Sequence, residues 1–204
     1  YTMAANTSGN NNTGLGYGAL GANTTASNNT AVGYKALESN TTGIGNCAVG
    51  VNALDANTTA NSNVGIGNDA LGSATTGGDN VAVGVGALTA STTGNSNSAL
   101  GRNAGSTVTT GSTNIIIGSG AVSSSSITTG SSNVIIGCNY NPGNQSNLLA
   151  FNNASQTISC SAGASSFSFS SDGRDKTDII DLSLGLDFIN KLTPRKFRWD
   201  YRDT

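Results

Sequence analysis

The chain has 204 residues, of which 36% are hydrophobic, 5% aromatic and 10% charged, while 28 are glycine. This leaves too little large apolar surface for one compact core of that length. The formal net charge is −2 and there is no basic patch, so we expect no nucleic-acid partner. Because no stretch approaches 18 apolar residues, we expect no membrane insertion either.

From near its start the chain repeats every seventeen residues. An asparagine marks each unit, and an aliphatic residue followed by glycine comes three and four places later. Alanine stands seven places after the asparagine, a leucine usually follows it, and a Thr-Thr pair such as Thr24-Thr25 closes the unit. Gly105 and Val122 replace the leucine in the last two units. The asparagines are Asn12, Asn29, Asn46, Asn63, Asn80, Asn97 and Asn114, and the glycines are Gly16, Gly33, Gly50, Gly67, Gly84, Gly101 and Gly118.

A period this strict indicates stacked coils in which equivalent side chains lie above one another. Disorder is the alternative that the composition allows, since tracts rich in Gly, Ser, Asn and Thr often stay unfolded. Disordered tracts, however, have no reason to keep one register across seven units. Helical repeats are excluded because helix pairs need about 33 residues or more, and glycine inside a helix costs about 1 kcal/mol. The predicted fold class is therefore mainly β, a repetitive β-solenoid or β-roll.

Seventeen residues suit two short strands and two turns in each coil. We expect the glycine after Val32 and its equivalents to adopt a positive φ or to lie close to another backbone. The asparagine column is expected to form a side-chain amide ladder. Seven coils at about 4.8 Å each make a rod of roughly 35 Å. The expected core of one Val, Ile or Leu, one Ala and one Leu per coil is thin. Some columns should therefore pack against neighbouring chains, with a homotrimer as the expected closed arrangement.

The repeat also predicts where the rod begins and ends. Met3 occupies the position of Leu20 one unit earlier, so the sequence begins within a coil, and we expect a shaft over 1–139 that is truncated at its N-terminal end. The spacing stretches to nineteen residues between Asn114 and Asn133, and Asn141-Pro-Gly is a turn signal that should end the coils. A neck over 140–170 follows, with short strands expected near 148–151 and 166–169.

Composition changes abruptly at Ser171, because most of the charged residues follow it. An apolar stripe over 182–192 predicts a helix, which Thr193-Pro194 ends. Aromatic residues then alternate with charged ones at Phe197, Trp199 and Tyr201, the pattern of an amphipathic strand. Residues 171–204 are thus predicted to form a short α+β segment.

Ser171-Asp172-Gly173-Arg174-Asp175-Lys176, the apolar stripe and Thr193-Pro194-Arg195 with Phe197-Arg198-Trp199 together resemble the start of the peptidase S74 family. Members of this family are intramolecular chaperones at the C-terminus of phage tail fibres and tailspikes. The repeats separately resemble coils of marine phage fibres and, less closely, head domains of trimeric bacterial adhesins. The resemblance implies that residues 171–204 help three chains to meet in register.

The same resemblance implies self-cleavage between Ser171 and Asp172. Ser171 would be the nucleophile and Lys176 would assist, since a lysine with a lowered pKa can take the hydroxyl proton. Asp172 and Arg174 would position the segment. The alternative is a surface loop in which Lys176 and Arg174 only pair with neighbouring carboxylates. Any enzymatic activity is therefore expected to be single-turnover autoproteolysis.

Other site chemistry is sparse. There is no histidine, and Cys47, Cys138 and Cys160 are irregularly spaced and odd in number, so we expect no metal site, disulfide framework or cofactor. The expected function is a fibre on the outside of a virion. Its partners would be other virion proteins and a host-cell receptor, for which a glycan is one candidate. The alternatives are a bacterial surface adhesin and an ice-binding solenoid. The last conflicts with the Thr-Thr pairs, because adjacent residues of a strand point to opposite faces.

Overall fold

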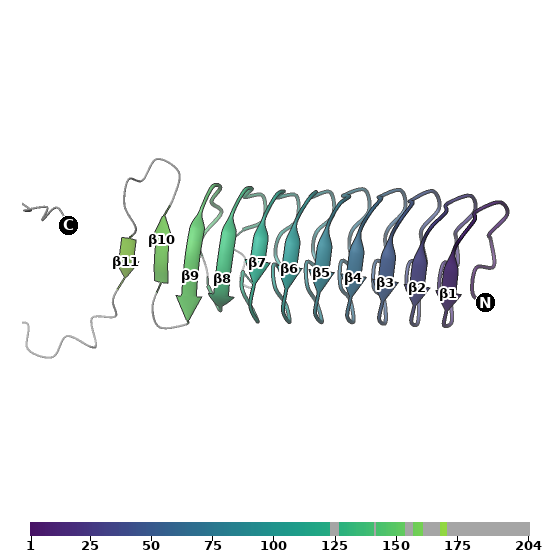
Figure 1. Ribbon diagram of the computed structural model, residues 1–204, viewed down its shortest axis with the longest axis horizontal. Helices are drawn as coiled ribbons and strands as arrows, with labels where there is room; N and C mark the ends of the chain where they lie inside the picture. Colours follow the sequence, from purple (N-terminus) through teal and green to yellow (C-terminus); the bar gives the residue numbers. More distant parts are fainter. Residues whose placement is uncertain (123–126, 141, 154–156, 161–167, 171–204) are drawn as a thin grey trace, which may run out of the picture. The chain divides into compact units, whose positions relative to one another are not determined.

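The computed structural model describes residues 1–122, 127–140, 142–153, 157–160 and 168–170. The coils form a parallel β-solenoid of about seventeen residues per turn, as the repeat predicts (Figure 1). The helix and strand predicted within 171–204 lie outside the described residues. The strands are β1 (Thr13–Leu15), β2 (Thr30–Val32), β3 (Cys47–Val49), β4 (Val64–Ile66), β5 (Val81–Val83), β6 (Ser98–Leu100), β7 (Ile115–Ile117), β8 (Val134–Cys138), β9 (Leu149–Asn153), β10 (Thr157–Cys160) and β11 (Ser168–Ser170).

All of these strands belong to one sheet, in chain order. From β1 to β7 each strand pairs in parallel with the residue seventeen places on, as Ala31 does with Ala48. The parallel ladder extends one strand beyond the turn signal at Asn141, because β9 still pairs in parallel with β8. The strand predicted near 148–151 is β9. The last pairs, β9 with β10 and β10 with β11, are antiparallel.

The prediction of two strands per coil was wrong for the described coils, which carry one strand each. After the strand the chain makes successive tight turns. The amide of Gly21 donates to the carbonyl of Gly18, and the amide of Asn23 to the carbonyl of Leu20. Coil-to-coil hydrogen bonding continues through these turns, for example from the Leu20 amide to the Ala36 carbonyl at 3.0 Å. The backbone groups of the turns are therefore paired without a second strand.

The turns place leucine in the left-handed region of backbone space. The φ angles of Leu20, Leu37, Leu54, Leu71 and Leu88 lie between 49° and 53°. A bulky residue rarely adopts such angles, and the strain costs about 1–2 kcal/mol. Each of these leucines is fully buried, which is worth about 1.5–3 kcal/mol and offsets the strain.

The expected core was wrong in one column. The leucine and alanine columns are buried as predicted, but the aliphatic residue before glycine points outward: Leu15 is 66% exposed and Leu100 52%. The middle residue of each strand faces inward instead. Ala31, Ala48 and their equivalents are fully buried, because the leucine of the preceding coil fills the narrow interior and leaves room only for a small side chain.

A large change inside the core at Gly105 is compensated. Gly105 stands where earlier coils have leucine, and the next strand has Ile116 in place of the usual alanine or glycine. A Cβ on Gly105 would lie 2.9 Å from Cδ1 of Ile116 and 2.9 Å from Cδ2 of Leu88. Ile116 therefore fills the volume that the missing leucine leaves, and packing is kept.

The predicted asparagine ladder is present. Its side chains form hydrogen bonds with backbone groups as well as with one another. Nδ2 of Asn80 donates to the Gly94 carbonyl at 2.8 Å, and its Oδ1 accepts the backbone amide of Asn97 at 2.9 Å. Nδ2 of Asn97 also donates to Oδ1 of Asn80 at 3.1 Å. The asparagines from Asn29 onward are 0–1% exposed, so the ladder satisfies buried backbone groups at the end of each coil.

A second, shorter amide ladder runs through Asn23, Asn40 and Asn57, in which each Nδ2 donates to the asparagine one coil earlier. The next residue in this column is Ala74, which has no donor. Oδ1 of Asn57 is accordingly the buried side-chain oxygen without a hydrogen bond in the described part of the chain. The ladder thus ends at an unsatisfied acceptor, which costs about 1–3 kcal/mol.

Both properties expected of the glycine column are observed. Gly84 has a φ of 137°, and a Cβ on it would lie 2.4 Å from the carbonyl oxygen of Gly101. Any other residue there would push two neighbouring coils apart. This column therefore sets how closely the coils stack.

Candidate interaction surface

The outer face of the parallel sheet carries two columns of side chains, the first and third residues of β1 to β8. We call it the outer face. It contains no charged residue, and from β4 onward nearly all of its side chains are aliphatic. The first column is Thr13, Thr30, Cys47, Val64, Val81, Ser98, Ile115 and Val134, and the third is Leu15, Val32, Val49, Ile66, Val83, Leu100, Ile117 and Ile136.

Spacings typical of a sheet give the outer face its dimensions. Eight strands about 4.8 Å apart and two columns about 6.8 Å apart make a stripe about 34 Å long and, with side chains, about 12 Å wide. Its area is on the order of 400 Å², within the range of the largest apolar patches on monomeric proteins, which are often functional. The stripe is a candidate contact surface because it is uncharged and, from β4 onward, nearly all aliphatic.

The outer face has a hollow at β6. Ser98 is the smallest residue in the first column, between Val81 and Ile115, and a depression of about 190 Å³ lies there. Val83, Leu100 and Ile117 form its other wall, and Ala99 contributes to its lining. On the same strand Leu100 is 52% exposed, compared with 37% for Ile117 in the same column. β6 therefore carries both the protruding and the recessed side chain of this region.

The turn after each glycine forms an edge beside the outer face. Tyr17 and Tyr34 stack there, with ring centroids 5.6 Å apart and planes 13° from parallel. The ammonium of Lys35 lies 5.8 Å from the Tyr34 ring centre. A hollow of about 470 Å³ lies beside Tyr17, lined also by Tyr1 and Glu38. The stack joins two coils through exposed aromatic rings.

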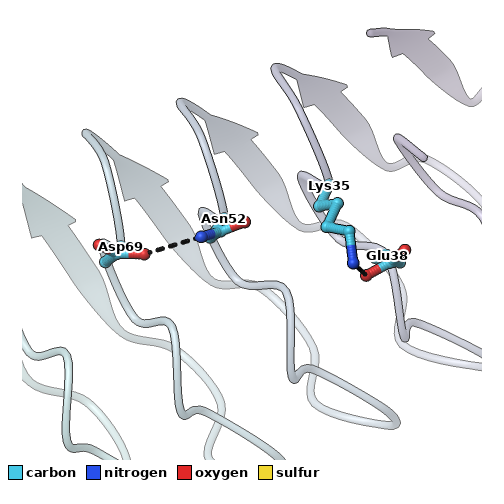
Figure 2. A network of polar contacts seen from close by, with 4 residues as sticks. All are labelled: Lys35, Glu38, Asn52 and Asp69. Carbon is cyan, nitrogen blue, oxygen red and sulfur yellow. Dashed lines mark hydrogen bonds and ion pairs between the residues drawn. The ribbon is translucent and has the colours of Figure 1, made fainter. Parts of the chain in front are cut away.

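Polar side chains follow along this edge on successive coils (Figure 2). Nζ of Lys35 lies 3.1 Å from Oε2 of Glu38, and Nδ2 of Asn52 donates to Oδ1 of Asp69 at 3.2 Å. The hydrogen bond with Glu38 raises the pKa of Lys35. Burial raises the pKa of Asp55, and the nearby carboxylates of Asp69 and Glu38 raise it further, while hydrogen bonds from backbone amides oppose the shift. These contacts join neighbouring side chains within a turn and between successive coils.

The site residues implied by the S74 resemblance, Ser171, Asp172, Arg174 and Lys176, lie outside the described residues, so their roles stay predictions. In the described ranges, no three His, Cys, Asp or Glu side chains gather where a metal ion could bind. Cys47 lies on the outer face, and the cysteines form no disulfide in this part of the molecule. The same part contains no helix with the length and hydropathy that crossing a bilayer requires.

The two residues of each threonine pair have different environments. The hydroxyl of the first threonine donates to the equivalent carbonyl one coil on, as from Thr41 to Thr58 at 3.0 Å and from Thr75 to Thr92 at 3.1 Å. The second threonine of each pair, such as Thr42, is exposed. The exposed threonines thus form a single column rather than the two on one face that ice binding needs.

No family model, curated protein or solved structure matches this chain.

The repeat pattern predicted that some columns pack against neighbouring chains, but the aliphatic residue before glycine was expected in the core rather than on the outer face. A sign was present in the sequence: the middle residue of each early strand is only Ala or Gly, as at Ala48 and Gly65. In a coil too narrow for two large residues, the small one faces inward. The hollow at Ser98 had a sign as well, since serine interrupts a run of Val and Ile in its column.

Proposed function

We propose that this chain is the shaft of a homotrimeric fibre on the outside of a virus particle, where it extends a host-contacting element. The observation that carries the proposal is the uncharged and largely aliphatic outer face along the solenoid. A shaft of three chains has to bury an apolar surface that runs its whole length, and like charges on that surface would repel between identical chains.

The sequence after Ser171 supports the same function. A seventeen-residue repeat permits slips of one whole coil, each of which leaves most contacts intact. Three such chains need a nucleus that sets a common register, and the S74-like segment would supply it. Cleavage between Ser171 and Asp172 would then release the nucleus and make assembly effectively irreversible. Other virion proteins and a host receptor, with a glycan as one candidate, would be the partners.

The location of the protein distinguishes the fibre from a bacterial surface adhesin, which is the second candidate. Antibodies raised against the solenoid should label the outside of virus particles in electron micrographs. Labelling confined to a bacterial cell envelope would reject the fibre and favour the adhesin.

Cleavage has its own test. The denatured mass of the full-length gene product should correspond to a chain that ends at Ser171, and Ser171→Ala should leave the chain uncut. A cut product from the Ser171→Ala variant would exclude Ser171 as the nucleophile. An uncut wild-type chain would make the C-terminal segment a permanent part of the fibre.

A further inference from the structure

We infer that three copies of this chain associate in parallel and in register through the outer face, with Leu100 of each copy seated in the Ser98 hollow of the next. The inference rests on the proposed function and adds which face, which register and which side chains form the interface.

The shape of β6 supports this pairing. Leu100 is the most exposed aliphatic side chain on the outer face after Leu15, and Ser98, two residues before it, forms the recess. A cavity of about 150 Å³ admits benzene, so a hollow of about 190 Å³ is large enough for an isobutyl group. The protrusion and the recess lie on opposite columns of one strand. They therefore fit each other when identical strands meet at the same level around an axis along the solenoid.

The same pairing of sizes recurs at the other end of the outer face. Leu15 is 66% exposed, and its strand has Thr13 in the first column. Strands with an aliphatic residue in both columns, such as β7, have less exposed third residues, with Ile117 at 37%. β2 differs, because Thr30 stands in its first column while Val32 is only partly exposed, so a protruding leucine is paired with a small polar residue at β1 and β6. A protruding and a small side chain on one strand favour a contact in register between copies, because each strand then meets the same strand of the neighbouring copy.

The absence of charge agrees with further copies of this chain as the occupants. None of the sixteen outer-face positions is charged, so identical copies meet without repulsion. In an antiparallel pair of solenoids, a strand could meet the same strand of the other copy at one position along the axis only. Leu100 would then face a residue other than Ser98 unless that strand is β6.

Disulfide trapping tests the contact directly. In the full chain with its three native cysteines replaced by serine, we introduce Ser98→Cys together with Leu100→Cys and oxidise under native conditions. A covalent product of three chains is expected on a denaturing gel. The matched control is Thr93→Cys with Asn95→Cys, which has the same spacing at exposed positions away from the sheet and should give single chains. A disulfide between positions 98 and 100 of the same chain is disfavoured, because the two Cα atoms are about 6.8 Å apart, at the limit of disulfide geometry.

Exchange of the two side chains gives a second readout. Ser98→Leu fills the recess and Leu100→Ser removes the protrusion, so each alone should raise the dissociation constant of the trimer about tenfold or more. Together they recreate a recess and a protrusion on the opposite columns, and the trimer should recover. A double variant as weak as the weaker single variant would overturn the pairing.

The outcomes separate this inference from the proposed function. A trimer by native mass that yields only single chains, or links equally at the control pair, overturns the outer-face contact but not the trimeric fibre. A two-chain product as the largest species overturns threefold association. A monomer by native mass overturns both.

Discussion

Replacing Asn80 with alanine tests what holds the coils together. Asn80 is fully buried, and its side chain donates to the Gly94 carbonyl while accepting the backbone amide of Asn97. Asn80→Ala leaves this carbonyl and this amide without partners in a site closed to water. The side-chain bonds of Asn80 to Asn63 and Asn97 are lost as well, but Oδ1 of Asn63 keeps the amide of residue 80 and Nδ2 of Asn97 keeps the Gly111 carbonyl, so only the two backbone groups lose every partner.

The magnitude follows from those two groups. Each buried, unpaired polar group costs about 1–3 kcal/mol, so Asn80→Ala should lower the free energy of unfolding by about 2–6 kcal/mol. Asn68→Ala is the control, since Asn68 is exposed and its one bond, to the Val51 carbonyl at 3.1 Å, can be replaced by water. We expect it to cost less than about 0.5 kcal/mol.

Hydrogen exchange is the most direct assay, because repeat proteins open locally and need not unfold in one step. The Asn97 amide should lose most of its protection in Asn80→Ala and keep it in Asn68→Ala. If the two variants cost the same in urea unfolding and the Asn97 amide stays protected, the asparagine ladder is not what joins the coils.

Further predictions concern single positions. Gly84→Ala should cost about 3 kcal/mol or more in thermal unfolding, because its Cβ would lie 2.4 Å from the Gly101 carbonyl oxygen; a variant as stable as the wild type would contradict the close stacking of the coils at this column. Gly105→Leu should overpack the core and Ile116→Ala should leave a cavity, whereas the double variant should recover most of the loss in a mutant cycle; additive losses would refute their complementarity. Ala74→Asn should stabilise the fold by about 1 kcal/mol by donating to Oδ1 of Asn57, and no gain would mean that this oxygen is already satisfied. Asp55→Asn should stabilise the fold at neutral pH. The folded chain binds the Asp55 proton more readily than the unfolded chain, so the ionised carboxylate destabilises the fold above its raised pKa. This benefit should vanish as the pH falls below about 3.8, and a benefit independent of pH would contradict the cause.

The sequence predicts stacking well because the recurring glycine and asparagine columns each meet a local physical requirement. Gly84 needs its backbone angle and Asn80 needs its buried partners, and both requirements recur at a period of seventeen. Orientation was harder to predict. Val32 and Ala31 alternate along a strand, and alternation alone does not say which of them faces inward. The deciding factor is the volume of Leu20 in the preceding coil, a contact that appears only when the coils are stacked.

The residues that form the tight turns could not be predicted from the sequence pattern either. Leucine is an unfavourable residue at positive φ, so nothing in its propensity predicts that Leu37 or Leu54 closes a tight turn. Burial in the stack overrides that local preference. The second amide ladder, in contrast, could have been found, because Asn23, Asn40 and Asn57 keep the same period.

The native mass of the purified full chain, measured over a range of concentrations, tests the central claim most directly. The account predicts an assembly with three times the mass that one chain shows under denaturing conditions, and Leu100→Ser should shift it toward single chains at the same concentration. A species with the mass of one chain at every concentration would show that the outer face binds no second copy, and would contradict the trimeric shaft.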